Sequence, residues 1–241
     1  MRPLFEPAPV NDAFGDPGLY VDFRDERRAL LFDLGDVAAL PPRKLLRISD
    51  IFVTHAHLDH FVGFDHWLRV VLGRKERVRL YGGPGFVDQV GYKLAAYTWN
   101  VVHRYDVALQ IEAHELAPDG SGRRACFSSL HRFAQEGAEP WSRDGDVVCA
   151  EDRFRVRAAF VDHDIPCLAW ALEESAHVNV WKNRLAEVGL PTGPWLRQAK
   201  RALLAGSPDD TPIDVRWNDH LGAHEKTRPL GELRHVFELV D

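Results

Sequence analysis

The sequence predicts a mixed α/β domain in which strands alternate with helices and the chemistry stands at strand ends. Short apolar or alternating runs typical of strands recur along the chain, and helical periodicity follows some of them. Polar residues with metal-binding side chains stand directly after two of the apolar runs. With 241 residues the chain can bury a large core, and we expect one domain over residues 1–241.

The composition is that of a folded globular protein. It is 45% hydrophobic and 27% charged, and no apolar run is long enough to cross a bilayer or to form the core of a signal peptide. The three cysteines are odd in number and widely spaced, so they fit a reducing cytoplasm and no disulfide framework or zinc knuckle. The formal net charge of -6 argues against indiscriminate nucleic-acid binding but is compatible with a local basic patch.

The first elements lead towards a strand end. Residues 1–18 are rich in Pro, Gly and Asp and indicate an irregular lead-in, whereas residues 19–23 and 29–32 predict two strands joined by a charged turn. Asp33 and Asp36 close the second strand. We favour the interpretation that both residues form and cap the turn. The alternative is that they hydrogen-bond to metal ligands and hold them in place.

The segment from Thr54 to His60 carries the strongest chemical signal. It lies between an apolar strand and a segment with helical periodicity. His55 and His57 alternate with an alanine, so an extended backbone points both imidazoles to the same side. Asp59 and His60 fall where the chain turns into the helix and can face a second ion. Imidazole and carboxylate suit zinc and similar ions, so one loop can serve two neighbouring metals.

Further strands and helices are expected in the middle of the chain. Helices are predicted over 61–72 and 86–99, and strands over 77–81, 107–112, 125–127 and 154–160. The Gly-Gly-Pro-Gly segment at 82–85 lacks the Lys and Ser/Thr of a nucleotide-binding loop, so a structural turn is favoured over a phosphate site. Residues 137–145 indicate a loop.

A second landmark follows the strand at 154–160. His163 stands at its end, just before a turn that contains Pro166. Zinc sites combine ligands from distant segments, so we predict that His163 supplies a third imidazole to the first ion. Asp162 and Asp164 are interpreted as turn residues or as supporting groups.

The third landmark is a basic segment around a Pro/Gly elbow at 189–194, which two short helices are expected to flank. Between 182 and 201 five cations stand against one acid, and they are Lys182, Arg184, Arg197, Lys200 and Arg201 against Glu187. Trp181 and Trp195 interleave with them, which is typical of a surface that grips a nucleic-acid backbone. A solvated face on ordinary surface helices explains the composition equally well.

Together these landmarks resemble the metallo-β-lactamase superfamily and, within it, the ribonuclease Z group, which trims the 3′ side of precursor tRNA. The pattern His-x-His-x-Asp-His at 55–60 carries the superfamily resemblance. The group resemblance lies in Asp162-His163-x-x-Pro166 and in the elbow before a basic helix. Residues 32–36, 63–64, 80–82 and 84–85 also match, so the resemblance covers residues 29–206.

The resemblance implies a four-layer αββα sandwich with two Zn²⁺ ions. His55, His57 and His163 would hold the first ion, and Asp59 and His60 the second. Asp59 would also be catalytic, positioning or deprotonating the water that attacks a phosphodiester. An exosite-like arm at about 176–230 would hold the tRNA through Lys182, Arg184, Gly193, Pro194, Arg197, Lys200 and Arg201. The resemblance further implies a cytoplasmic hydrolase with no membrane partner, and relatives are commonly homodimers.

Three features depart from the family pattern. The first 18 residues lack the usual opening strand with its Gly-Thr turn, and Ala169-Trp170 stand where Gly-Tyr is often found. A bridging Asp and a final His for the second ion are not found, so we expect a sandwich that is incomplete at its C-terminal side. Asp241 follows an apolar run, but a ligand should be followed by chain that caps it. His220, His224 and His235 are expected on the surface, in a polar, loop-like region.

Two other functions stay open at this point. The first keeps the metals but replaces tRNA with a small phosphodiester or another small substrate, which the acidic charge favours and the elbow disfavours. The second is a truncated, inactive module that binds RNA or itself through residues 176–206. Two measurements distinguish the three functions. One is the zinc content of the protein, and the other is the cleavage of a tRNA with a 3′ trailer compared with that of a generic phosphodiester.

Overall fold

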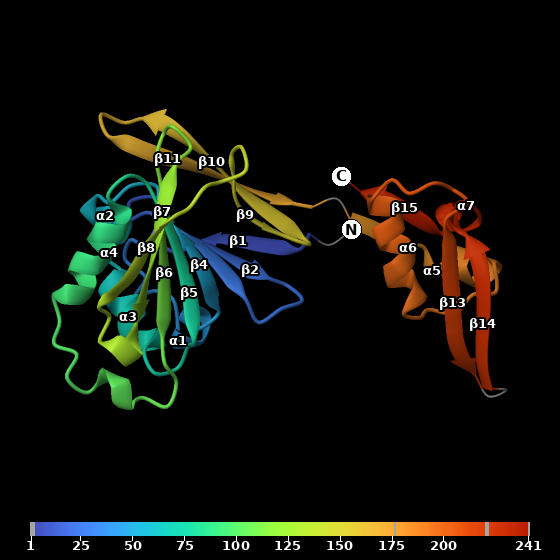
Figure 1. The fold of residues 1–241 in the computed structure, drawn as a ribbon, viewed down its shortest axis with the longest axis horizontal. Helices are drawn as coiled ribbons and strands as arrows, with labels where there is room; N and C mark the ends of the chain where they lie inside the picture. The colour runs from blue at the N-terminus through green and yellow to red at the C-terminus, as the bar shows by residue number, and fades with distance from the viewer. Residues whose placement is uncertain (1–2, 176, 220–221, 241) are drawn as a thin grey trace. The chain divides into compact units, whose positions relative to one another are not determined.

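The structure is a computed structural model that describes residues 3–175, 177–219 and 222–240. It divides into two compact units, Met1–Ala150 with Arg155–Glu173 and Glu151–Phe154 with Glu174–Asp241 (Figure 1). Each unit has a hydrophobic core of its own. The second unit contains the range expected for the arm, 176–230, and its place as an arm of a single domain stays a prediction. None of the helices in the described segments has the length and apolar content needed to cross a membrane.

An eight-stranded sheet forms the centre of the first unit, with its strands in chain order. The strands are β1 (Phe5–Pro9), β2 (Leu19–Phe23), β3 (Ala29–Phe32), β4 (Ile48–Phe52), β5 (Arg77–Gly82), β6 (Gln110–Leu116), β7 (Gly122–Ser128) and β8 (Gln135–Pro140). Strands β3 to β6 are parallel, and the pairs outside them are antiparallel. The carboxyl ends of the parallel strands therefore meet along one edge, where loops from different strands can come together.

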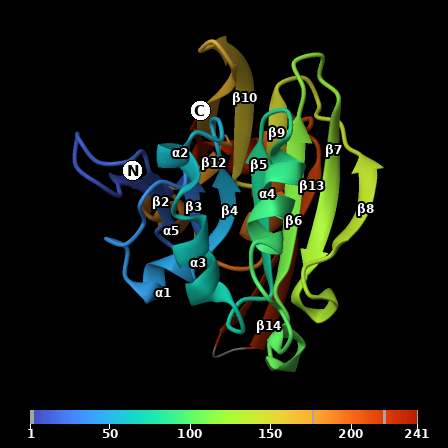
Figure 2. The ribbon, with the colours of Figure 1, turned by 90° about the vertical axis from the view of Figure 1, so that its left-hand side faces the viewer.

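Helices cover one face of this sheet, as Figure 2 shows for α3 and α4. The helical segments of the unit are α1 (Pro42–Leu45), α2 (Leu58–Phe61), α3 (Phe64–Val71), α4 (Phe86–Ala95), η1 (Val102–Arg104) and η2 (Ser129–His131). In α3, the apolar residues Phe64, Trp67, Leu68 and Val71 recur at helical spacing and are buried. They join the inward-facing residues of the parallel strands, such as Leu31, Ile51, Leu80 and Ile111, in the main core.

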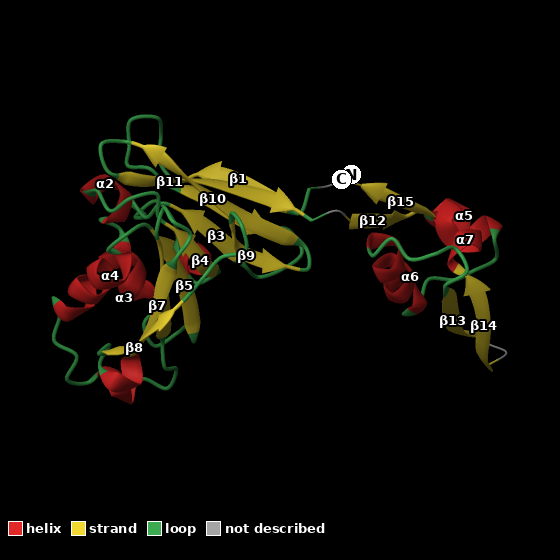
Figure 3. Cartoon of the chain, turned by 45° about the horizontal axis from the view of Figure 1, so that its top comes forward, coloured by secondary structure: helices red, strands yellow, loops and turns green. Residues whose placement is uncertain are grey.

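A second sheet packs on the other face. It contains β9 (Val147–Glu151), β10 (Phe154–Asp162) and β11 (Pro166–Glu174) in the order β11-β10-β9. The rings of Phe52 on β4 and Trp170 on β11 lie 5.3 Å apart between the two sheets. Figure 3 distinguishes the helices of the unit from its strands by colour and labels strands of both sheets. The described residues of this unit thus build three of the four layers that the resemblance implies.

The second unit combines short helices with two small sheets. Its elements are β12 (His177–Val180), α5 (Lys182–Glu187), α6 (Trp195–Leu204), β13 (Pro212–Asp219), β14 (Gly222–Pro229), α7 (Leu230–Leu233), η3 (Arg234–Val236) and β15 (Phe237–Val240). Strand β12 pairs with β15, and β13 pairs with β14, both antiparallel. The buried face of α6 packs with Ile213 and Val215 of β13 in one core.

Several expected elements are wrong in detail. Residues 5–9 form strand β1, although an irregular lead-in was expected, because they pair with β2 along the sheet edge. Residues 135–140 form β8 through pairing with β7, so the loop expected at 137–145 begins later. Helix α4 ends at Ala95 and not at 99. His224 lies in β14 and not in a loop, whereas Asp241 and His220 lie outside the described residues.

The helix expected over 61–72 is interrupted at residue 63. A Cβ atom on Gly63 would lie 1.9 Å from the carbonyl oxygen of Gly35, a distance at which no side chain fits. The Gly63 N–H instead donates to the carbonyl of Leu34 at 2.9 Å. The chain therefore breaks into α2 and α3 because its backbone docks on the turn that follows β3.

Candidate metal centre

The loop after β4 lies at the carboxyl edge of the parallel strands. His57 is the residue that precedes α2, and the N–H of His60 donates to its carbonyl at 3.1 Å. The Leu34 N–H donates to the carbonyl of His60 at 2.9 Å, so the turn after β3 holds this loop from the side. Gly35 permits the approach, since a Cβ there would lie 2.5 Å from the carbonyl of Asp59.

Three imidazoles converge at this edge. One nitrogen each from His55, His57 and His163 lies within 4.8 Å of the other two. The ring centre of His163 is 4.9 Å from that of His55 and 5.9 Å from that of His57. Nε2 of His55 and Nδ1 of His57 face each other at 2.9 Å. The structure thus brings together the three residues that the sequence assigned to one ion.

The hairpin between β10 and β11 carries His163 to the loop. The Leu168 N–H donates to the carbonyl of Thr54 at 2.9 Å, which ties β11 to the loop after β4. The turn itself is made by Asp164, whose φ is 60°, and its N–H donates to Oδ1 of Asp162 at 3.2 Å. Both aspartates therefore serve the turn, which is one of the two roles expected for them.

The three rings have the donor chemistry that a divalent metal requires. A tetrahedral zinc with bonds of about 2.0–2.1 Å takes imidazole nitrogens about 3.3 Å apart, so small side-chain rotations bring the three nitrogens into range. Burial, helped by the neighbouring imidazoles of His60, His57 and His163, lowers the pKa of His55 to about 4. A neutral ring is the state that binds a metal. His55 is only 7% exposed, whereas His57 and His163 are exposed and leave one side open.

Asp59 and His60 lie beside this group as a pair. Nε2 of His60 is 3.6 Å from Oδ2 of Asp59, and the ring centres of His60 and His55 are 4.1 Å apart. The Asp59 side chain is 56% exposed, so it is open to water. Within the described ranges, the three-histidine cluster is the one group of three or more metal-binding side chains, and Asp59 and His60 are not part of it.

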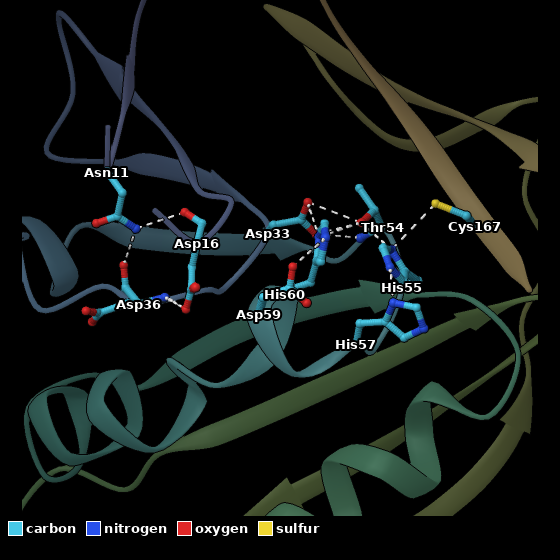
Figure 4. A network of polar contacts seen from close by, with 10 residues as sticks. All are labelled: Asn11, Asp16, Asp33, Asp36, Thr54, His55, His57, Asp59, His60 and Cys167. Carbon is cyan, nitrogen blue, oxygen red and sulfur yellow. Dashed lines mark hydrogen bonds and ion pairs between the residues drawn. The ribbon is translucent and has the colours of Figure 1, made fainter. Parts of the chain in front are cut away.

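Asp33 supports the loop from behind, as the close-up in Figure 4 shows. Its Oδ1 accepts from the N–H of Thr54 at 2.7 Å and from Oγ1 of Thr54 at 3.0 Å, and its Oδ2 lies 2.9 Å from Nδ1 of His60. Burial raises the pKa of Asp33, and the hydrogen bonds from Thr54 and His60 act against that rise. With a φ of 59°, Asp33 is also a turn residue, so it fills both roles, including the one not favoured from the sequence.

Asp36 keeps to the turn role. Its Oδ1 accepts from the Ala38 N–H at 2.8 Å, and its backbone contacts Asn11 and Asp16 (Figure 4). The Gly-rich turn before α4 is likewise structural, because Gly85 has a φ of 84° and the helix starts directly after it.

The residues expected to bind tRNA lie in the second unit. Lys182 and Arg184 are on α5, Gly193 and Pro194 are in the elbow, and Arg197, Lys200 and Arg201 are on α6. Arg184 donates to the carbonyl of His235 at 2.8 Å and lies 5.2 Å from the ring centre of Trp181. Lys200 is partly buried, which lowers its pKa, whereas Arg197 and Arg201 are exposed.

Trp195 corrects the expectation of two interleaved surface tryptophans. It is 2% exposed, packs in the core of the unit and donates from Nε1 to the carbonyl of Pro191 at 3.1 Å. The helical spacing of α6 turns it inward with Ala199, which the basic composition alone did not reveal. Trp181 is 41% exposed and keeps the surface position that was expected.

The elbow borders a groove of about 610 Å³ that the sequence did not indicate. Its lining includes Gly193, Pro194 and, from β13, Arg216 and Trp217. Trp217 stacks on His224, with ring centres 5.1 Å apart and planes inclined by 14°. No signal in the sequence linked β13 to the elbow, because the two meet through the packing of α6 on β13 and the close approach of Gly193 to the backbone of Arg216.

Comparison with known proteins identifies related chains. Residues 16–92 match the metallo-beta-lactamase superfamily. A ribonuclease Z of Deinococcus radiodurans is 30% identical over 174 residues, which cover 71% of this chain and 52% of that protein. A ribonuclease Z of Limosilactobacillus fermentum is 27% identical over 215 residues, or 85% of this chain and 57% of that protein. The chain spans about half the length of the curated relatives it matches.

Among solved structures, the short form of human tRNase Z superposes with a TM-score of 0.44 and 19% identity, covering 71% of this chain and 62% of that chain. The sequence matches confirm the resemblance to the superfamily and to ribonuclease Z, and the fold confirms the mixed α/β class.

Proposed function

Since residues 16–92 carry the metallo-β-lactamase superfamily match, we propose that this chain acts as a metal-dependent endoribonuclease of the ribonuclease Z type. Its reaction would be cleavage of precursor tRNA on the 3′ side. The observation that carries the proposal is the convergence of His55, His57 and His163, from two segments more than a hundred residues apart, on one open point of the surface.

The proposed cofactor is Zn²⁺. His55, His57 and His163 would hold one ion, while Asp59 and His60 would contribute to a second. When bound, such ions polarise a phosphodiester and make a bound water acidic near neutral pH. Asp59, half exposed beside His60, would accept the proton of the attacking water and orient it. Asp33 would hold His60 in place during the reaction.

The proposed tRNA contacts come from the second unit. The exposed cations on α5 and α6, together with Gly193 and Pro194 of the elbow, would bind the phosphate backbone. Arg216 and Trp217 in the adjoining groove add a cation and an aromatic face to the same surface. We further propose that the protein is a cytoplasmic homodimer, as members of this group commonly are. Light scattering, which gives the mass of the assembly, tests the dimer.

Two measurements test this proposal together. Elemental analysis of the purified protein should find close to two zinc ions per chain, the number that a two-metal hydrolase uses. The protein should also cleave a tRNA that carries a 3′ trailer far faster than a generic phosphodiester. Zinc binding without cleavage of the tRNA would refute the assignment of the substrate, and absence of bound metal would refute the whole mechanism.

A small-substrate hydrolase is the second candidate. The net charge of -6 disfavours the binding of an anionic RNA. The burial of Trp195 and the partial burial of Lys200 leave less aromatic and cationic surface to contact it. This candidate predicts comparable turnover of a small phosphodiester and of the tRNA, with no effect of added tRNA on hydrolysis of the small ester. A third candidate, an inactive binding module, predicts one zinc ion or none and no turnover.

A further inference from the structure

One hydroxyl group connects both sets of candidate ligands. Oγ1 of Thr54 lies 3.0 Å from Nδ1 of His55 and 3.1 Å from Nδ1 of His60. The same oxygen lies 3.0 Å and 3.2 Å from the two carboxylate oxygens of Asp33. His55 belongs to the three-histidine cluster, and His60 belongs to the neighbouring pair with Asp59. Figure 4 shows Thr54 with His55, His60 and Asp33.

The number of hydrogens restricts how these groups can bond. A hydroxyl has one hydrogen to donate and can also accept, whereas an ionised carboxylate only accepts. Asp33 therefore takes the hydroxyl hydrogen of Thr54, and it also takes the Nδ1–H of His60, 2.9 Å from its Oδ2. The Thr54 oxygen is then an acceptor for the Nδ1–H of His55. In this arrangement every group has a partner.

The arrangement leaves both rings with a free lone pair at Nε2. For His55 that nitrogen faces Nδ1 of His57 at 2.9 Å, and for His60 it faces Oδ2 of Asp59 at 3.6 Å. In the metal-free protein the Nδ1–H of His57 can donate to Nε2 of His55, and a bound cation would take the place of that hydrogen. The ring orientation that Thr54 and Asp33 impose is therefore the one that favours a metal at both positions.

We propose that Thr54 is a positioning residue that couples the two metal positions. When His55 is held through Nε2, its Nδ1–H occupies the Thr54 oxygen, the Thr54 hydrogen goes to Asp33, and Asp33 in turn orients His60. The inference rests on the proposed metal-dependent function but concerns metal binding and not the RNA.

The two rings should not depend on Thr54 equally. His60 keeps its contact with Asp33 when the hydroxyl is lost, whereas His55 keeps only Sγ of Cys167, 3.6 Å from its Nδ1. Sulfur is a weak acceptor, so it replaces the hydroxyl oxygen poorly. Loss of the hydroxyl should therefore weaken the three-histidine position first.

The test compares Thr54→Val, which keeps the shape and removes the hydroxyl, with Thr54→Ser, which keeps the hydroxyl. Thr227→Val is a matched control, because Thr227 also donates to an aspartate, Oδ1 of Asp214 at 2.9 Å, in the second unit. Zn²⁺ affinity is measured by titration against a chelator, and the ring N–H positions of His55 are read by ¹⁵N NMR in the metal-free protein. Thermal unfolding of each metal-free variant shows that it is folded.

We expect Thr54→Val to lower Zn²⁺ affinity by about 10- to 100-fold, the usual effect of losing a group that orients a ligand. It should also shift the hydrogen of His55 away from Nδ1, while Thr54→Ser and Thr227→Val behave like the wild type. The proposal is overturned if Thr54→Val binds Zn²⁺ normally, if Thr54→Ser is as weak as Thr54→Val, or if the wild type binds no metal. If the Zn²⁺ affinities and the NMR data follow these expectations but the protein does not cleave tRNA, the proposed substrate is refuted and the coupling through Thr54 stands.

Discussion

His114 offers a sharp test of how the interior of the first unit is organised. It lies on β6 and is 5% exposed, with its ring stacked 4.7 Å from that of Tyr81 and edge-on, at 5.0 Å, to that of Trp141. Neither ring nitrogen has a hydrogen-bond partner among the described residues, and the nearest carboxylate oxygen, on Glu112, is 3.8 Å from Nε2. Burial therefore lowers the pKa of His114 from its ordinary value of about 6.5 to about 4.

The direction of the pH effect follows from this shift. A folded-state pKa below the unfolded value means that the unfolded chain binds the proton more readily. The contribution of the neutral His114 ring to stability is fully present above the pKa of the unfolded chain. It is lost as the pH falls towards the pKa of the folded protein. Because the unfolded chain takes up this proton, the free energy of unfolding should fall by about 2.5 kcal/mol between pH 7.5 and pH 4.5.

His114→Phe removes this cost and keeps an aromatic ring between Tyr81 and Trp141. At pH 7.5 the variant should be as stable as the wild type or more stable by about 1 kcal/mol, because two unpaired buried nitrogens are gone. At pH 4.5 its advantage should grow by about 2.5 kcal/mol. Urea unfolding at both pH values, with a chelator present, measures the difference. The lowered pKa of His55 is common to both proteins and cancels in this comparison.

A difference in stability that stays constant between the two pH values would refute the reasoning. It would mean that His114 finds a partner that stabilises its charge, such as Glu112 or a buried water. A variant that is less stable than the wild type at both pH values would show that its ring does not fit between Tyr81 and Trp141.

Three further predictions concern the candidate site and its support. Asp59→Ala should abolish hydrolysis of both tRNA and small esters, measured as turnover under zinc-saturated conditions, because the attacking water loses its proton acceptor. The double substitution of Lys200 and Arg201 by Ala should weaken tRNA binding in a gel-shift assay and lower its salt dependence, while hydrolysis of a small ester stays intact. Gly63→Ala should cost several kcal/mol of stability in thermal unfolding, since its Cβ would lie 1.9 Å from a carbonyl oxygen.

Two of these have a control variant within the chain. His66→Ala, at an exposed position of α3 beyond the loop, should leave turnover nearly unchanged. Gly91→Ala, inside α4, meets only ordinary contacts at 3.5 Å from the Phe127 ring and should be neutral or stabilising by up to about 1 kcal/mol. Equal loss of tRNA and small-ester hydrolysis in the double substitution would contradict the exosite. Full stability of Gly63→Ala would contradict the docking of residue 63 on Gly35.

Local pattern was enough to predict the chemistry of the loop after β4. The alternation of His55 and His57 and the turn at Asp59 and His60 are set by strand periodicity and by the start of the next helix. His163 was also predicted, because an imidazole at a second strand end is a natural partner for them. The strands at 19–23 and 29–32 followed from residue type, and their bounds agree with the structure.

Contacts between segments remote in the chain were not predictable in the same way. The support that Asp33 gives to Thr54 and His60 depends on the parallel pairing of β3 with β4, which places two strand ends side by side. The break in the helix at Gly63 depends on the approach of Gly35. Neither contact is encoded in a short stretch of residues, so periodicity predicted one continuous helix, and the turn role of Asp33 was favoured over its support of the metal site.

The sequence by itself determined which side chains can do chemistry here and on which strand ends they stand, because spacing along one strand sets the direction of neighbouring side chains. Only the tertiary structure decided that His163 reaches His55, that one threonine hydroxyl joins two ligand sets, and that Trp195 is core and not surface. Those results arise from sheet pairing and side-chain packing, which join residues that are far apart in the chain.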